Sequence, residues 1–247
     1  MMRPFLWVVL LALAACVSSA PKINNAKMAE GYYMKGLSHL QEKDYELASV
    51  EFNRSIQTDD HYKQSYYGLG IIMDTQGKYA EAIKYYEKAI DLDPNFSEAY
   101  NALGVVHSRQ QQWKDAIKAF QKALANKLYT TPHIAYLNLG DAYMMQKDYA
   151  KAADAYRESK RFVNIELTIY RLGTALSEAG RTKEAIKEFQ EGVGMAPQNP
   201  NLRYSLALAL LKDGNKKSAQ AEFEKVVKLN PKSELALKAN DYIKTLR

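Results

Sequence analysis

Cysteine is almost absent from this chain of 247 residues, and Cys16 is the only one. A single thiol excludes a disulfide within the chain, so the fold has to be stabilised by packing. It also excludes a zinc site built from several cysteines. Among the four histidines, His39, His61, His107 and His133, no pair has metal-ligand spacing with a carboxylate. We therefore expect no metal site.

The sequence also lacks the usual signatures of catalysis. It contains neither a glycine-rich phosphate loop nor the strand-turn-helix motif of a nucleophilic serine. Asp91 and Asp93 stand just before Pro94, where the end of a helix explains them better than acid–base work. We predict that the protein is not an enzyme and that it binds neither a cofactor nor a small-molecule substrate.

Dense blocks of one charge are missing as well. The chain has 34 Lys and Arg against 28 Asp and Glu, a net charge of +6, and the two signs are interspersed. A basic balance without a basic patch argues for solubility and not for nucleic-acid recognition. We predict no nucleic-acid partner.

The N-terminal residues hold a short apolar run. Arg3 precedes Phe5–Ala15, which is apolar or small throughout. At about 11 residues it is too short for a membrane-spanning helix of about 20 and has the form of a secretory signal. The segment Leu13-Ala14-Ala15-Cys16 resembles a bacterial lipobox. That resemblance implies cleavage before Cys16, a diacylglycerol on its thiol and a fatty acyl group on the new amine. The alternative is an ordinary signal peptide or anchor with an incidental cysteine.

We accordingly assign residues 1–15 to a lipoprotein signal peptide. Residues 16–28, which include the polar stretch "VSSAPKINNAKM", are predicted to be a lipidated N-terminus and tether. Val17, where an aspartate would favour inner-membrane retention, implies a lipid-anchored protein on the periplasmic face of the outer membrane. Two or three acyl chains give stable anchoring.

From residue 29 the sequence repeats. Glycines recur at intervals of 34, 34, 36 and 33 residues, and Ala207 takes the next position. An alanine follows twelve residues after each, and an aromatic residue four later. The recurring residues are Gly36, Gly70, Gly104, Gly140 and Gly173; Ala48, Ala82, Ala116, Ala152, Ala185 and Ala219; and Phe52, Tyr86, Phe120, Tyr156, Phe189 and Phe223.

This pattern resembles the tetratricopeptide-repeat family at its expected period. The resemblance implies an all-α, right-handed superhelical solenoid of about six helix pairs. We place the repeats at about 29–62, 63–96, 97–130, 133–165, 166–199 and 200–233. Residues 234–247 are predicted to form a capping helix, with Leu235, Ala239 and Ile243 covering the last repeat.

The first helix of each repeat is expected to line a partner-binding groove. Tyrosine and other large apolar side chains are favoured where an apolar peptide docks. We predict groove positions at Tyr33, Leu37, Leu40, Tyr67, Ile71, Asn101, Asn138, Tyr170 and Arg171. The apolar first two repeats are expected to provide the main contact. The alternative, at each position, is burial against the neighbouring helix.

The period lengthens once, in "NKLYTTPHIAYLNLG", Asn126 to Gly140. This joint is either a tolerated loop insertion or a family feature. It resembles the junction of the type IV pilus pilotins, lipoproteins with about six such repeats. The matching residues are Tyr129, Thr131, Pro132, Ala135, Asn138, Leu139 and Gly140.

The pilotin resemblance implies a non-enzymatic adaptor. Such a protein binds a secretin subunit, and its lipid brings that subunit to the outer membrane, where the secretin multimerises. The competing hypothesis is a periplasmic scaffold lipoprotein for peptidoglycan enzymes or outer-membrane protein assembly. Both have a lipobox and repeats, so the partner separates them.

Overall fold

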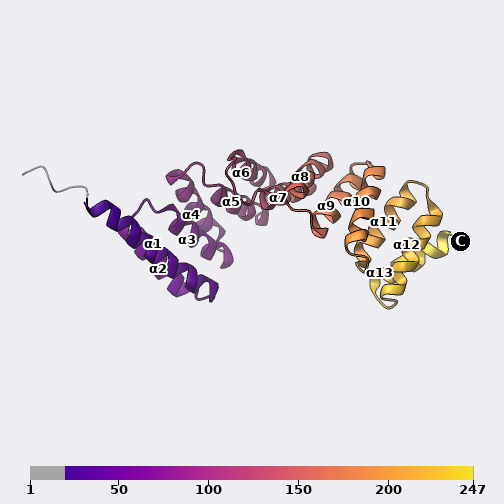
Figure 1. Ribbon diagram of the computed structural model, residues 1–247, viewed down its shortest axis with the longest axis horizontal. Helices are drawn as coiled ribbons and strands as arrows, with labels where there is room; N and C mark the ends of the chain where they lie inside the picture. The colour runs from indigo at the N-terminus through magenta and orange to yellow at the C-terminus, as the bar shows by residue number, and fades with distance from the viewer. Residues whose placement is uncertain (1–19, 247) are drawn as a thin grey trace, which may run out of the picture. The chain divides into compact units, whose positions relative to one another are not determined.

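The computed structural model describes residues 20–246, which form thirteen α-helices and no strand. Consecutive helices make antiparallel pairs, and the last helix follows the sixth pair (Figure 1). The pairs are α1 (Ala20–Gln41) with α2 (Tyr45–Thr58), α3 (Lys63–Thr75) with α4 (Tyr79–Leu92), α5 (Ser97–Arg109) with α6 (Trp113–Ala125), α7 (Pro132–Met145) with α8 (Tyr149–Phe162), α9 (Glu166–Glu178) with α10 (Thr182–Met195), and α11 (Pro200–Lys212) with α12 (Lys216–Leu229), followed by α13 (Glu234–Leu246). The predicted all-α solenoid of repeats is confirmed.

The beginning of α1 differs from the predicted tether. The helix starts at Ala20, so residues 20–28, which were predicted to belong to the tether, are helical. Pro21 lies in the first turn, where a proline's missing N–H is not needed, and no glycine interrupts residues 20–28. Ser55 of α2 donates a hydrogen bond of 2.7 Å to the Ala29 carbonyl and holds this part of the helix. The predicted signal peptide and Cys16 lie outside the described residues.

The chain divides into two compact units, which meet in sequence at Pro94 and Asn95. In the first unit, Ala48, Phe52, Leu69 and Ile72 form a buried core between α1–α2 and α3–α4. In the second unit, the largest core extends from Ala152 to Ile243 and is built mainly from alanine, leucine and the repeat aromatics. Each core joins neighbouring repeats, as expected for units that cannot bury their apolar faces alone.

The glycine of each first helix lies directly against the aromatic ring of the second helix. A Cβ built on Gly36, Gly70, Gly104, Gly140 or Gly173 would fall 2.4 to 2.6 Å from a ring carbon of the same repeat. Those rings belong to Phe52, Tyr86, Phe120, Tyr156 and Phe189. All six repeat alanines of the second helices are fully buried. The recurring small and aromatic residues are therefore packing positions.

The turn inside each repeat has one geometry throughout. One residue of each turn has a positive φ: Lys43, Gly77, Gln111, Lys147, Gly180 and Gly214. The next backbone N–H bonds a carbonyl five residues earlier, as Asp44 does to His39 at 2.9 Å and Asn215 to Leu210 at 2.9 Å. This bond is the helix-terminating pattern that a left-handed residue permits.

The irregular joint between α6 and α7 is packed around a tyrosine. Tyr129 is buried with Ala123 and Ala135, and burial raises the pKa of its hydroxyl. Pro132 occupies the first turn of α7, where proline is well tolerated. Leu128, by contrast, is 86 % exposed. Packing thus accounts for several residues of the motif that resembles the pilotin junction.

The last helix closes the second unit as predicted. Ala239 and Ile243 are buried against the final repeat, and Leu235 packs beside them. Tyr242 adds a contact that the sequence pattern did not single out, because its ring stacks on Phe223 with centroids 4.9 Å apart. An apolar repeat end is thereby covered.

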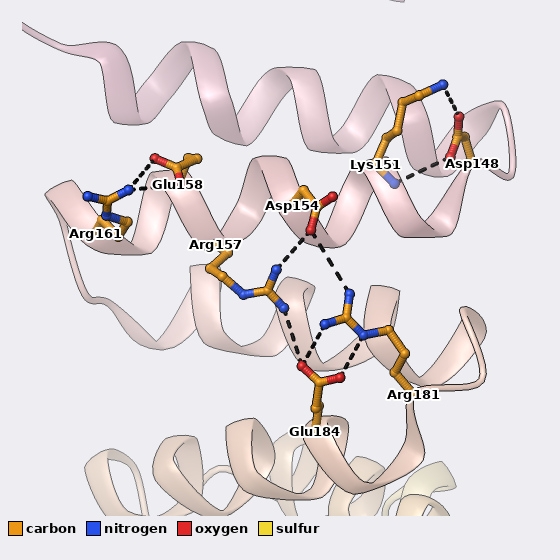
Figure 2. A network of polar contacts seen from close by, with 8 residues as sticks. All are labelled: Asp148, Lys151, Asp154, Arg157, Glu158, Arg161, Arg181 and Glu184. Atoms are coloured by element: carbon orange, nitrogen blue, oxygen red, sulfur yellow. Dashed lines mark hydrogen bonds and ion pairs between the residues drawn. The ribbon is translucent and has the colours of Figure 1, made fainter.

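A ring of four charges connects α8 with the start of α10 (Figure 2). Arg157 lies 2.8 Å from Asp154 and 3.5 Å from Glu184. Arg181 makes two hydrogen bonds to Glu184, of 2.7 and 2.6 Å, and approaches Asp154 to 4.0 Å. The ring joins the fourth repeat to the fifth on the side of their second helices.

Candidate partner-binding site

Within each unit, first helices of neighbouring repeats come into contact. In the first unit α1 contacts α3, and in the second unit α5 contacts α7 and α9 contacts α11. All nine predicted groove residues lie on these helices, and every one is partly exposed. Each therefore leaves part of its surface exposed while contributing to the packing.

In the first unit the apolar candidates gather around one ring. Tyr33, Leu37 and Leu40 pack against the core that contains Phe52. The Tyr33 ring lies 5.7 Å from that of Phe52 and 5.5 Å from that of Tyr62, and burial raises the pKa of the Tyr33 hydroxyl. These three residues form a half-buried apolar surface on α1.

The groove tyrosines follow a rule that links them to the core. Each of them, like Tyr204 at the same position of α11, has its ring tilted or edge-on against the aromatic residue nineteen positions later, in the second helix of its own repeat. The pairs are Tyr33–Phe52, Tyr67–Tyr86, Tyr170–Phe189 and Tyr204–Phe223. Ile71 is partly exposed one turn beyond Tyr67 on α3. The tyrosines consequently pack against the core and are also partly exposed.

Two asparagines replace this apolar pattern in the third and fourth repeats. Asn138 of α7 donates a hydrogen bond of 3.1 Å to the side-chain carbonyl of Asn101 on α5. Both side chains are partly exposed. The structure thus brings together two predicted groove residues that are 37 positions apart.

Arg171 is held by a carboxylate that joins two repeats. The Arg171 guanidinium of α9 donates to Asp141 of α7, and the Tyr156 hydroxyl donates to the same carboxylate at 2.6 Å. Burial raises the pKa of Asp141, although the hydrogen bond from Tyr156 and the charge of Arg171 act in the opposite direction. Burial also raises the pKa of the Tyr156 hydroxyl. Arg171 is therefore committed to an ion pair within the protein.

A pocket that the sequence pattern did not reveal lies beside these polar residues. It has a volume of about 310 Å³ and is here named the Trp113 pocket. Its lining residues are Val105, Ser108 and Arg109 of α5, Trp113 and Phe120 of α6, and Asn138, Asp141, Ala142 and Met145 of α7. Tyr45, Tyr79 and Tyr149 hold the position of Trp113 in the first, second and fourth repeats, so the repeat pattern does not mark Trp113 as special. The pocket is formed where α5, α6 and α7 meet, and the repeat pattern of the sequence does not predict that arrangement.

Tyr170 lines a second hollow, of about 600 Å³, between α9 and α11. Ile165 and Leu167 provide its apolar side, and Asn199 and Asn201 its polar side. Asn199 also caps α11 through hydrogen bonds to the N–H groups of Asn201 and Leu202. This amide is therefore already used by the helix terminus.

One loop of the first unit brings together potential metal ligands. Ligand atoms of Asp59, Asp60 and His61 lie within 4.8 Å of one another. The His61 ring nitrogen is 2.7 Å from the Asp60 carboxylate, and the Asp59 carboxylate accepts from the His61 backbone N–H. Local hydrogen bonds explain this exposed group.

Within residues 20–246 no helix is both long and apolar enough to cross a bilayer.

Models of the tetratricopeptide repeat match most of the chain. A model described as TPR repeat matches residues 75–111, and three described as tetratricopeptide repeats match residues 29–62, 101–163 and 176–240. Among curated proteins, the human intraflagellar transport protein 88 homolog is 27 % identical over 108 residues, 41 % of this chain. The chain matches 13 % of the length of that relative, so the likeness concerns the repeats.

Two solved structures share the fold over nearly their whole length. The first, Pseudomonas aeruginosa PilF, has a TM-score of 0.73 and 18 % identity, with 88 % of this chain and 99 % of that chain covered. The second is PilW, described as a widely conserved type IV pilus biogenesis factor, with a TM-score of 0.68 and 18 % identity over 86 % of this chain and 98 % of that one. The repeated helix pairs, their glycine–aromatic contacts and these matches together identify the chain as a member of the tetratricopeptide-repeat family.

Proposed function

We propose that the protein is a lipid-anchored adaptor that binds a secretin subunit and promotes its multimerisation in the outer membrane during type IV pilus biogenesis. In this proposal the repeats bind the secretin, and the acylated Cys16 holds the complex at the periplasmic face of the membrane. The protein performs no reaction itself.

The observation that carries the proposal is the extent of the likeness to PilF and PilW. Those chains are covered over 99 % and 98 % of their length, so the likeness extends along the array and is not confined to one repeat. The lipobox-like Leu13-Ala14-Ala15-Cys16 supplies an independent reason to expect an anchor. The anchor would act by raising the effective concentration of the secretin at the membrane.

The half-buried apolar surface of Tyr33, Leu37 and Leu40 is the proposed main contact. A few buried side chains, among which tyrosine is enriched, contribute most of the binding free energy at interfaces. Because Tyr33 also packs on Phe52, a substitution there changes stability together with binding.

A deletion strain tests this function directly. Separated membranes are analysed for heat-resistant secretin multimers and monomers, with complementation by the wild-type gene or by Cys16→Ser. We expect multimers to be lost on deletion, restored by the wild type and not restored by Cys16→Ser. The Ser variant should fold normally, since its repeats are unchanged, but should leave the outer-membrane fraction.

Normal secretin multimers in the deletion strain would refute the pilotin role. Pull-downs with peptidoglycan enzymes and outer-membrane assembly proteins would then test the scaffold alternative. A Cys16→Ser protein that still fractionates with the outer membrane would refute the anchor and leave the binding role open to the same multimer assay.

A further inference from the structure

One edge of the second unit carries most of the exposed apolar side chains of that unit. Because the helices of each pair are antiparallel, the first helices begin and the second helices end on the same edge. Ser159 near the end of α8 donates a hydrogen bond of 2.8 Å to the His133 carbonyl at the start of α7, as this arrangement requires. The exposed residues there, here named the apolar edge, are Leu128, Ile134, Phe162, Ile165 and Leu167.

The turn that presents Leu128 is fixed by the residues around it. The side-chain carbonyl of Asn126 accepts from the Leu128 backbone N–H at 3.0 Å, and the Asn126 amide donates to the Asn95 carbonyl at 2.9 Å. Tyr129, the next residue, is buried, whereas Leu128 is 86 % exposed. A side chain that an ordered turn holds outward can bind with little further loss of backbone entropy.

The same edge continues into a basic pocket. Ile165 and Leu167 share a hollow with Asn199 at the start of α11. Beside the loop before α11 lies a further pocket of about 410 Å³, here named the basic pocket. Its lining residues are Pro197 and Gln198 of that loop, Arg203 of α11, and Lys225, Lys228 and Leu229 of α12.

The basic pocket holds more positive charge than the protein neutralises. Glu222 accepts from Arg203 at 2.8 Å and from Lys225 at 2.6 Å. Lys228 is exposed, as is Lys127 directly before Leu128, and within residues 20–246 neither forms a hydrogen bond or an ion pair. Three cations around one carboxylate leave two positive charges at the pocket, which therefore attracts an anionic group.

Exposed apolar side chains beside unpaired cations match the surface of an anionic bilayer. Apolar side chains enter the boundary between headgroups and acyl chains, while lysine and arginine are attracted to anionic headgroups. The length of chain before α1 brings such a surface near. Cys16, the proposed anchor, lies four residues before Ala20, so α1 would begin within about 14 Å of the lipid.

We propose that the apolar edge and the basic pocket form a second membrane contact, which binds the surface of an anionic phospholipid bilayer. This rests on the proposed function in that the acylated Cys16 holds the chain at a membrane. None of the predicted groove residues belongs to this contact. Without the anchor the contact is weak and reversible, so Cys16→Ser should still leave the outer-membrane fraction in cells.

Vesicle flotation tests the contact in the absence of acyl groups. The chain without residues 1–15 and carrying Cys16→Ser is mixed with vesicles of phosphatidylethanolamine and phosphatidylglycerol, or of phosphatidylcholine alone. We expect binding to the anionic vesicles to be at least about fivefold tighter. Leu128→Asp should weaken it about tenfold, and Leu237→Asp, which alters an exposed leucine of α13, less than about twofold. Equal binding by Leu128→Asp and the parent protein would overturn the proposal.

Two lysines of α12 give a charge-matched test of the basic pocket. Lys228→Glu and Lys217→Glu change the net charge equally, but Lys217 lies in the first turn of α12, at the opposite edge. We expect Lys228→Glu to weaken binding to anionic vesicles at least about fivefold and Lys217→Glu less than about twofold. Equal weakening would mean that the attraction depends on net charge alone, and the pocket would be refuted.

A single label shows whether Leu128 enters the bilayer. Because Cys16 is the only cysteine, Cys16→Ser combined with Leu128→Cys provides one site for an environment-sensitive fluorophore. We expect its emission to shift to the blue with anionic vesicles, and the same label at Leu237→Cys to remain unchanged. A shift that needs only a higher protein concentration would mean that a second copy covers the apolar edge, and would overturn the proposal.

The vesicle and secretin assays separate the two proposals. Absence of vesicle binding would overturn the second membrane contact and leave the proposed function standing, because secretin multimers are measured independently. Vesicle binding that depends on Leu128 and Lys228, together with normal multimers in the deletion strain, would support the contact and refute the pilotin role.

Discussion

At the residue scale, missing side chains are as important as present ones. The rings of Phe120, Tyr156 and Phe189 lie across Gly104, Gly140 and Gly173, where a Cβ would come within about 2.6 Å. Other glycines have no such neighbour: a Cβ on Gly194, inside α10, would meet nothing within 4 Å. Replacing glycine by alanine should therefore have opposite effects on stability at these two kinds of helical position.

We predict that Gly104→Ala lowers the free energy of unfolding by about 1–3 kcal/mol, because the methyl group forces the Phe120 ring to move. Gly194→Ala should raise it by about 0.5–1 kcal/mol through helix propensity. Urea unfolding followed by circular dichroism measures both. If the Gly104→Ala protein were as stable as Gly194→Ala, the close contact between Gly104 and the Phe120 ring would not exclude a methyl group.

The residues that pack the repeats were predicted well from the sequence. Glycine, alanine and aromatic positions recur because the same contact recurs in every repeat. The left-handed turn residues were only half visible, since Lys43, Gln111 and Lys147 stand where Gly77, Gly180 and Gly214 mark the other turns. The Asp141–Arg171 pair was missed because its partners come from different repeats and no periodicity relates them.

At the element scale, α8 and α10 are joined by charge as well as by apolar packing. Lys160 of α8 contacts Glu188 and Glu191 of α10, each at 2.7 Å. Its side chain is 17 % exposed, whereas that of the neighbouring Arg161 is 73 % exposed and pairs within its own helix. Lys160 therefore forms ion pairs between two repeats, whereas its neighbour Arg161 forms one within a single helix.

We predict that Lys160→Met lowers the free energy of unfolding by about 1 kcal/mol, because two glutamates then face each other without a cation. Arg161→Met should change it by less than about 0.5 kcal/mol. Urea unfolding at neutral pH compares the two variants. Equal effects would mean that the Lys160 contacts contribute no more than an exposed pair.

The pH dependence of that difference follows from the same contacts. The hydrogen bond from Lys160 lowers the pKa of Glu191 in the folded protein below the ordinary value of 4.5. The ionised carboxylate therefore stabilises the fold at pH values above 4.5, and this stabilisation is lost as the pH falls through the pKa of the folded state. Burial lowers the pKa of Lys160, but the hydrogen bonds to Glu188 and Glu191 outweigh it and raise the pKa above 10.5. The difference between wild type and Lys160→Met should therefore be full near neutral pH and shrink below pH 4.5.

Element boundaries were predicted better inside the array than at its start. Repeat spacing places each helix pair because loops carry turn residues at fixed offsets. The beginning of α1 has no such marker: residues 17–28 are small and polar, and composition alone does not distinguish a tether from a helix that gains its stability by packing on α2. The Trp113 pocket escaped for a related reason, because three helices from two repeats create it.

At the scale of the whole molecule, each repeat depends on its neighbours. Ile243 of α13 is buried against the last repeat, while Leu237 of the same helix is exposed. Stability in such an array is approximately a sum of repeat and interface terms, so a change at one end should act locally.

We predict that Ile243→Ala lowers the stability of the last repeat by about 2–4 kcal/mol, whereas Leu237→Ala has little effect. Amide hydrogen exchange should show faster exchange in α11 and α12 and unchanged exchange in α5 and α6. A uniform increase across residues 95–246 would instead mean that the second unit unfolds as a single cooperative block.

The uniform turns also bear on how the gene can change. Each of the six turns has one left-handed residue and the same backbone hydrogen bond, whatever side chain it carries. Recombination between the codons of two such turns would delete or duplicate a whole repeat in frame and require no new backbone conformation. The joint at residues 126–131 is different, since Tyr129 fits a single buried place there. An array inherited by duplication should therefore vary in length elsewhere and keep one copy of this joint.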